Sequence, residues 1–166
     1  EAAHALELAT AKNDRSWSHM IEGVGTTIAL EAWDQKYKPN QDWNHAWGAA
    51  PANIIPRKVM GVEPIEPGFR TVRIRPRPGD LKQAALLSPT IRGPIKVEFT
   101  SAPSEFVLDV DLPANMKGRV ELPRPTSPGE VTVTVDGAVR QVKNEGGLLV
   151  LESIGSGPHR IVQTSH

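Results

Sequence analysis

The period of the hydrophobic pattern changes near residue 60, and this change constrains the fold more than any other feature of the sequence. Residues 1–12 are rich in alanine, leucine and glutamate, which are good helix formers. Beyond residue 61, apolar residues alternate with polar ones, as they do along a half-buried strand. The pattern therefore predicts an α+β chain in two parts, in which a helical part precedes a β-sandwich.

The helical part contains two further helix signals. Residues 26–33 are expected to form one short helix after a glycine-rich break. Asp42 is a candidate N-cap for a second helix over residues 43–61, which Pro51 and Pro56 are expected to kink or split. Because the chain starts in a run of helix formers with no initiator methionine, we expect it to begin in mid-helix, as a piece cut from something larger.

The second part is expected to be an antiparallel β-sandwich with about eight or nine short strands. Asp136-Gly137 follows a cleanly alternating run and predicts a two-residue type I′ hairpin turn. The expected strands cover residues 70–75, 95–99, 106–112, 118–122, 131–135, 139–143, 148–152 and 159–164.

Charge and motif content exclude several function classes. Lysine plus arginine equals aspartate plus glutamate at 19 each, which argues against nucleic acid or an anionic membrane as a partner. The chain has no cysteine and no apolar run of the roughly 20 residues that span a bilayer. It also lacks a phosphate-binding loop, a nucleophile elbow and a zinc-binding helix motif. We therefore expect no cofactor and no metal.

The sandwich part offers little chemistry. Its carboxylates fall on alternating polar faces and are expected to be solvated; they are Glu98, Asp109, Asp111, Glu121 and Glu130. Arg70, Arg73, Arg75 and Arg77 are expected to form ion pairs on a sheet face. His159 and His166 are expected to have no partners.

Residues 22–47 differ from the rest because they combine aromatic and acidic side chains. A sugar site needs both, since an indole stacks on the apolar face of a pyranose and charged groups bond its hydroxyls. The alternative is that the tryptophans pack a core and the charges form a solvated rim, and periodicity does not separate the two. The residues concerned are Glu22, Glu31, Trp33, Asp34, Tyr37, Asp42, Trp43, His45 and Trp47.

Four motifs in this order resemble the bacterial α-L-rhamnosidases of glycoside hydrolase family 78. The first resembles the family's Gly-Ala-Thr-Thr-x-x-Glu-x-Trp stretch, and the second its Asn/Ser-His-x-Trp-x-Ala-x-Pro stretch. The others resemble its Gly-Ile-x-Pro and Pro-Gly-Phe junction and the opening strands of its C-terminal β-domain. The four motifs lie at residues 22–34, 44–51, 60–69 and 71–95.

The resemblance implies an architecture and roles. Residues 1–61 would be the C-terminal end of an (α/α)6 barrel that carries the active site, and residues 62–166 a C-terminal β-sandwich. The family is inverting and uses two carboxylic residues, of which Glu31 would be the general base. His45 would contact the rhamnose. The remaining implied substrate-binding residues are Trp33, Trp43, Trp47 and Asp34.

The family's general acid lies in an acidic, arginine-containing motif on an earlier barrel segment, and nothing like that motif occurs here. We therefore expect residues 1–166 alone to be inactive and the rest of the parent catalytic domain to be a partner. The expected substrate is a rhamnose-containing oligosaccharide, polysaccharide or glycoside. The alternative function is a non-catalytic carbohydrate-binding or structural sandwich. Residues 62–166 contain no tryptophan or tyrosine, which favours a supporting role for that half.

Overall fold

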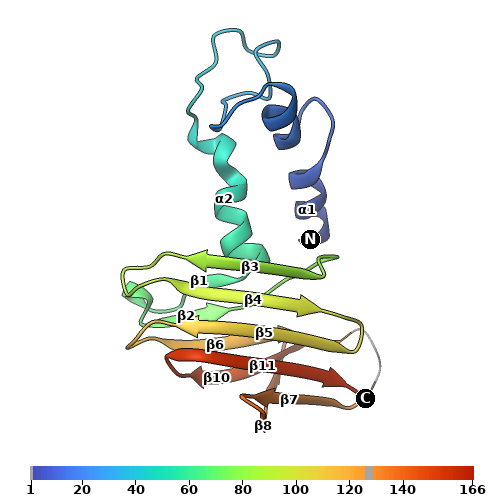
Figure 1. Cartoon of the computed structure of the whole chain (residues 1–166), viewed down its shortest axis with the longest axis vertical. Coiled ribbons are helices and arrows are strands. Elements are labelled where there is room, and N and C mark those ends of the chain that lie inside the picture. The colour runs from blue at the N-terminus through green and yellow to red at the C-terminus, as the bar shows by residue number, and fades with distance from the viewer. Residues whose placement is uncertain (1, 126–128) are drawn as a thin grey trace. The chain divides into compact units, whose positions relative to one another are not determined.

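A computed structural model describes residues 2–125 and 129–166. The chain divides into two compact units between Ile55 and Pro56. Glu1, the first residue of the expected helix and of the expected first domain, lies outside the described residues. The first unit contains short helices and irregular segments, and the second is built mainly of strands (Figure 1). The predicted α+β organisation is therefore confirmed. Within the described ranges, no helix has the length and apolar character needed to cross a membrane.

The N-terminal unit begins with α1, Ala2–Thr10, where the alanine-rich run predicts a helix. A π-helix follows at His19–Gly23. Local polar contacts mark its beginning, because the buried Ser16 hydroxyl donates to the Asn13 carbonyl (2.6 Å) and accepts from the His19 N–H (3.1 Å). Such side-chain contacts with the backbone favour a turn or a helix start over a continuous helix.

The predicted helix over residues 26–33 is wrong, because this stretch is irregular. The Thr26 hydroxyl bonds to nearby backbone, accepting from the Ile28 N–H (3.2 Å) and donating to the Ile28 carbonyl (2.9 Å). The Glu31 N–H donates to the Asp42 carbonyl (3.0 Å), which lies eleven residues further along the chain. Backbone groups that a helix would pair with one another therefore have other partners here.

The predicted split of the helix near the two prolines is confirmed. The chain forms a 3₁₀ turn at Ala46–Ala49, then α2 at Ala50–Ile54 and a π-turn at Ile55–Val59. Pro51 lies in the first turn of α2, where its missing N–H leaves no bond unmade. Asp42 does not cap this helical region, since the residue before the 3₁₀ turn is His45 and its side chain makes no capping bond.

The C-terminal unit is a β-sandwich whose two sheets lie one behind the other in Figure 1. One sheet has the order β1 (Val62–Pro64), β2 (Thr71–Ile74), β6 (Lys117–Pro123), β10 (Leu148–Ile154) and β9 (Lys143–Glu145). The other has the order β3 (Gln83–Ser88), β4 (Ile95–Ser101), β5 (Glu105–Leu112), β11 (Gly157–Ser165), β7 (Val131–Val135) and β8 (Ala138–Val139). A 3₁₀ turn at Pro67–Phe69 connects β1 to β2.

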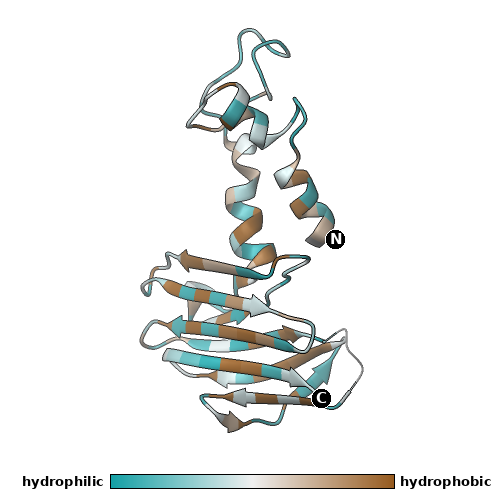
Figure 2. Ribbon diagram, turned by 45° about the vertical axis from the view of Figure 1, so that its right-hand side comes forward, coloured by the Kyte–Doolittle hydropathy of each residue, from teal (hydrophilic) through white to brown (hydrophobic). Residues whose placement is uncertain are grey.

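The alternation in the sequence determines which side of each sheet faces the core. Along β4, Ile95, Val97 and Phe99 are buried, whereas Lys96 and Glu98 between them are exposed. Figure 2 shows this alternation as brown and teal bands along the strands. The inward residues of both sheets form one core, because successive side chains of a strand point to opposite faces.

Three features of the sheets differ from the sequence predictions. β3 was not expected, because its Gln-Ala-Ala-Leu-Leu-Ser sequence lacks the β-branched residues typical of strands. This segment is a strand because it pairs with β4. The β2–β6 pair is parallel, whereas the other pairs of named strands among the described residues are antiparallel. The predicted strand over residues 139–143 is wrong, because β8 and β9 belong to different sheets. The chain therefore crosses from one sheet to the other between Val139 and Lys143.

The turn between β7 and β8 is the predicted type I′ hairpin. Asp136 and Gly137 both have positive φ, at 53° and 82°, and Val135 pairs with Ala138 across a two-residue loop. Positive φ at both central positions defines this turn type, which explains the preference for an Asp-Gly sequence.

The arginine run pairs with carboxylates, as predicted, at three of its four positions. Arg70 contacts Glu66 (3.1 Å), Arg73 contacts Glu63, and Arg75 lies 3.6 Å from Glu121. The carboxylates that pair with these arginines thus belong to neighbouring strands and turns.

Two predictions about the polar residues of the sandwich are wrong. Glu121 was expected to be solvated but is buried, where it accepts a hydrogen bond from Arg119 (2.8 Å). His159 was expected to have no partner, but its Nδ1 lies 2.8 Å from Asp136 in the β7–β8 turn. Arg119 lies two residues before Glu121 on the same face of β6, whereas Asp136 lies 23 residues before His159, where the local pattern does not reveal it.

Candidate active site

The segments that carry Glu31 and His45 lie against each other within the N-terminal unit. The His45 N–H donates to the Ala29 carbonyl (2.9 Å). Gly48 permits this approach, because a Cβ atom at that position would lie 2.3 Å from the Leu30 carbonyl oxygen. The two sequence motifs that contain the predicted base and the predicted sugar-binding histidine are thereby brought together.

Glu31 is largely buried, with a side chain that is 15% exposed, and its carboxylate has two partners. One oxygen accepts from the Lys38 ammonium and the other from the Asp42 N–H (3.1 Å). The hydrogen bond from Lys38, followed by that from Asp42, lowers the pKa of Glu31, and the nearby His45 acts in the same direction. This carboxyl group is therefore ionised over a wider pH range than an unpartnered glutamate.

His45 stacks on Trp47, with 4.3 Å between ring centroids and 28° between the planes. The Nδ1 atom of His45 is buried and has no hydrogen-bond partner among residues 2–125 and 129–166. Trp47 is 67% exposed, so one indole face is open to solvent. The pair therefore presents an aromatic surface beside the carboxylate of Glu31.

A shallow pocket of about 320 Å³ contains three of the predicted site residues, Glu31, Trp33 and Trp47. Trp17 also lines it and meets Trp33 edge to face, with 5.0 Å between ring centroids. The Trp17 indole N–H donates to the Gly48 carbonyl (2.7 Å), which orients the ring. The pocket thus combines an ionised carboxylate with indole walls.

The structure leaves three predicted residues outside the wall of this pocket: His45, which stacks on Trp47, and Asp34 and Trp43. Asp34 bonds through Oδ2 to His19 Nε2 (2.7 Å), and this contact, followed by the Lys36 N–H, lowers the pKa of Asp34. Trp43 is 43% exposed and is not part of the pocket wall. The tryptophans therefore do not act as one group: Trp17, Trp33 and Trp47 share a pocket, and Trp43 lies apart.

Sequence reasoning missed Lys38, His19 and Trp17 as members of this site. Trp17 belongs to the tryptophan-rich region and could have been included on that ground. Lys38 and His19 had no usable signal, because they lie seven and fifteen residues from their partners in irregular backbone. Across the part of the chain that the structure describes, no three His, Asp or Glu side chains are grouped in a way that could hold a metal.

Two family models match the chain, one in each of its two parts. The family model of the six-hairpin glycosidase domain of bacterial alpha-L-rhamnosidase matches residues 1–59. The model of the alpha-L-rhamnosidase C-terminal domain matches residues 61–137. The chain belongs to the bacterial α-L-rhamnosidase family. The pocket lies in the part of the chain that matches the glycosidase-domain model.

Individual relatives show the same similarity over most of the chain. A curated alpha-L-rhamnosidase from Streptomyces avermitilis is 30% identical over 154 residues, which cover 87% of this chain and 14% of that protein. The solved structure of the Streptomyces avermitilis enzyme complexed with L-rhamnose is 29% identical, with a TM-score of 0.75 over 95% of this chain and 16% of that one. The structure of alpha-L-rhamnosidase from Dictyoglumus thermophilum has a TM-score of 0.82 over 97% of this chain and 19% of that one, at 23% identity.

The chain thus spans about one seventh of the length of the curated relative. The similarity to the solved structures establishes the fold, with barrel helices followed by a β-domain.

Proposed function

We propose that the full-length protein hydrolyses terminal α-L-rhamnosides with inversion and that Glu31 is its general base. The observation that carries this proposal is the ionised Glu31 carboxylate in a pocket walled by Trp33 and Trp47. A carboxylate next to a sugar-sized aromatic surface is suited to accept a proton from water at an anomeric carbon. The substrate is a rhamnose-containing oligosaccharide, polysaccharide or glycoside.

In this mechanism Glu31 takes a proton from water while the water oxygen attacks the anomeric carbon. Each oxygen of the carboxylate accepts one hydrogen bond, which leaves lone pairs free for the water. A carboxylic acid from another part of the parent enzyme protonates the leaving oxygen. The product sugar then has the opposite anomeric configuration, because attack and departure occur on opposite faces.

The neighbouring residues hold the sugar. His45 bonds a rhamnose hydroxyl, and its stacking on Trp47 holds the imidazole ring beside the pocket. Trp33 and Trp47 provide the apolar walls, and Trp43 contributes at the edge of a bound substrate. Asp34, which His19 holds ionised, accepts hydrogen bonds from more distant sugar hydroxyls.

The two parts of the chain have different roles in this proposal. Residues 1–61 contribute the base and sugar contacts to the catalytic domain, and residues 62–166 form a supporting β-sandwich. We propose that residues 1–166 alone do not turn over substrate, because no acidic, arginine-containing motif like that of the family's acid occurs among them.

The test is Glu31→Gln in the full-length protein, with Glu7→Gln as control, since Glu7 is an exposed glutamate of the same unit. We expect kcat on an aryl α-L-rhamnoside to fall by about three orders of magnitude or more for Glu31→Gln and to be unchanged for Glu7→Gln. NMR of the first product should show the β anomer. Near-normal turnover by the Glu31 variant would exclude its role as base, and an α product would exclude inversion.

A further inference from the structure

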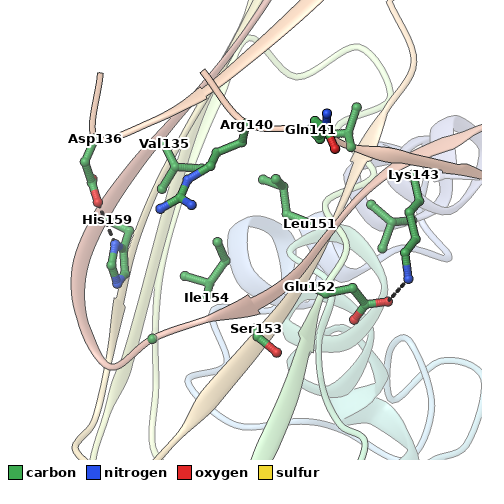
Figure 3. A pocket seen from close by; sticks show the side chains of 13 residues that line it. Val135, Asp136, Arg140, Gln141, Lys143, Leu151, Glu152, Ser153, Ile154 and His159 are labelled. Atoms are coloured by element: carbon green, nitrogen blue, oxygen red, sulfur yellow. Dashed lines mark hydrogen bonds and ion pairs between the residues drawn. The ribbon is translucent and has the colours of Figure 1, made fainter. Parts of the chain in front are cut away.

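The sandwich contains a second pocket, about 480 Å³ in volume, at the place where the chain crosses between the sheets (Figure 3). It is formed by the β7–β8 hairpin, the crossing segment at residues 140–143, and the turn between β10 and β11. Its volume is within the usual range for small-molecule sites and is sufficient for one or two sugar rings. All of its walls belong to the C-terminal unit.

The floor of this pocket is apolar and its rim is polar. Val135, Leu151 and Ile154 are buried core residues whose outer edges form the floor. The register of β10 shifts between Leu151 and Ile154, and Ser153 in this bulge has a φ of 57°. Bulges and positive φ at a non-glycine residue redirect side chains and are often found at binding sites.

The two carboxylates at the pocket already have partners. Asp136 accepts from the Arg160 N–H (2.8 Å) and contacts His159 Nδ1 (2.8 Å). Glu152 accepts from Arg119 and lies 3.9 Å from the Lys143 ammonium. Two of these contacts appear as dashed lines in Figure 3. Arg119 and Lys143 offset the charge of Glu152, whereas Asp136 is a carboxylate held by hydrogen bonds.

Several hydrogen-bond donors remain available. No described residue forms an ion pair or hydrogen bond with the Arg140 guanidinium, which extends over the pocket toward the side of His159 in Figure 3. The side chains of Gln141 and Ser153 are likewise without a hydrogen bond to any described residue. Lys143 is held only at the 3.9 Å distance given above. Arg140 thus faces the pocket without an ion pair to any described residue, and Lys143 is held only at a distance by Glu152.

We propose that this pocket binds a carboxylate-bearing sugar, of the hexuronate class, separately from the catalytic site. Arg140 pairs with the carboxylate, Lys143 and Gln141 bond ring hydroxyls, and the apolar floor contacts the C–H face of the ring. Because residues 62–166 contain no tryptophan or tyrosine, recognition depends on charge and hydrogen bonds rather than on stacking. The proposal is independent of the role of Glu31.

The experiment is a calorimetric titration of the full-length protein with methyl β-D-glucuronide and, separately, with methyl β-D-glucoside. We expect saturable binding of the glucuronide and at least tenfold weaker binding of the neutral glucoside. Raising the salt concentration should weaken binding of the glucuronide, since an ion pair at an open site is screened. Equal affinity for the two sugars, or no glucuronide binding up to about 20 mM, would overturn the proposal.

Variants then locate the site. Arg140→Gln and Lys143→Gln should each weaken glucuronide binding about tenfold, whereas Arg77→Gln, the same change at an exposed arginine outside the pocket, should not. Both pocket positions are exposed, so the fold should tolerate the substitutions. Binding that survives both pocket variants but is lost in Glu31→Gln would place the ligand in the catalytic site and refute the proposal. If acetate competes as strongly as the glucuronide, the pocket is a simple anion site that does not recognise the sugar ring, and the proposal is refuted.

Discussion

Within the candidate active site, the ion pair between Glu31 and Lys38 is the single contact with the greatest chemical consequence. A base must be ionised to accept a proton, and a neighbouring ammonium favours that state. The Asp42 N–H adds a second donor that belongs to the backbone and cannot be removed by mutation of a side chain. Lys38 is therefore the position at which the charge state of Glu31 can be changed without changing Glu31 itself.

Lys38→Gln in the full-length protein should shift the acidic limb of the kcat/KM profile to higher pH. Lys38 is the largest contributor to the lowered pKa of Glu31, so its removal lets that pKa rise. Lys36→Gln is the matched control, because Lys36 lies two residues away and pairs with Asp14 (2.9 Å). An acidic limb that does not move in the Lys38 variant would mean that another group controls it.

Glu63 makes the stability of the sandwich depend on pH. Hydrogen bonds from Lys58 and Arg73 lower its pKa from 4.5 to about 2 despite its burial. Because the unfolded chain binds this proton more readily, the contribution of Glu63 is complete above pH 4.5 and is lost as the pH falls toward 2. In urea titrations, Glu63→Gln should lower the free energy of unfolding at pH 7, and that free energy should then fall less steeply as the pH is lowered.

The control is Glu98→Gln, at an exposed position of β4, which should leave the pH dependence of the free energy of unfolding unchanged. The same pH dependence in wild type and Glu63→Gln would contradict this account.

At the scale of elements, backbone geometry determines where strands begin and end. Gly61 precedes β1 with a φ of 76°, and its carbonyl accepts from the Arg75 N–H (3.1 Å) at the end of β2. A Cβ atom at residue 61 would lie 2.0 Å from the Arg75 carbonyl oxygen. Gly137 in the β7–β8 turn has a similar φ of 82° but open space around it. Alanine variants at the two positions can therefore distinguish the cost of a positive φ, which both share, from the cost of a steric clash, which only residue 61 has.

Gly61→Ala should be much more destabilising than Gly137→Ala. Both changes place alanine at positive φ, which costs about 1–2 kcal/mol. Only the change at residue 61 also forces β1 away from β2, and we expect its total cost to exceed about 3 kcal/mol. Hydrogen exchange of the β1 and β2 amides, compared between the two variants, measures the difference. Similar exchange in both would mean that the backbone near Gly61 yields easily.

For the molecule as a whole, the two units differ in how well they bury their apolar residues. The sandwich has a continuous core, whereas the N-terminal unit exposes large apolar side chains. Leu30 is fully buried within this unit. The exposed residues of this unit are Leu8, Ile21, Ile28, Tyr37, Trp43, Trp47, Ile54 and Ile55.

A polypeptide of residues 1–166 should therefore self-associate, whereas residues 56–166 alone should be monomeric. Exposed apolar surface favours association, and a formal net charge of zero provides little repulsion at neutral pH. Sedimentation velocity on the two polypeptides at equal concentration tests this expectation. A monodisperse monomer for residues 1–166, with α1 protected from hydrogen exchange, would show that the unit is stable by itself.

The sequence predicted regular elements well where side-chain periodicity is strong. The strands around Ile95 and Val131 and the turn at Asp136 follow from local alternation and local turn chemistry. It failed at residues 26–33, because their backbone groups bond to a segment more than ten residues away. It also missed β3, whose conformation depends on its neighbour in the sheet.

In the candidate site, too, the residue types could be predicted from local motifs, whereas their contacts could not. Glu31, His45 and the tryptophans could be named from their motifs, because those residue types and spacings are local properties of the sequence. Lys38 as the partner of Glu31, His19 as the partner of Asp34 and the separation of Trp43 could not be predicted, because irregular backbone has no period from which to infer contacts.

The sequence by itself determined the order of helical part and sandwich, the inward face of most strands and the residue types of the site. Only the tertiary structure decided the parallel β2–β6 pair, the partners of Glu31 and the pocket beside Arg140. The physical reason is distance along the chain. Local periodicity and turn geometry act over a few residues, whereas pairing of remote strands, ion pairs and cavities depends on which distant segments pack together.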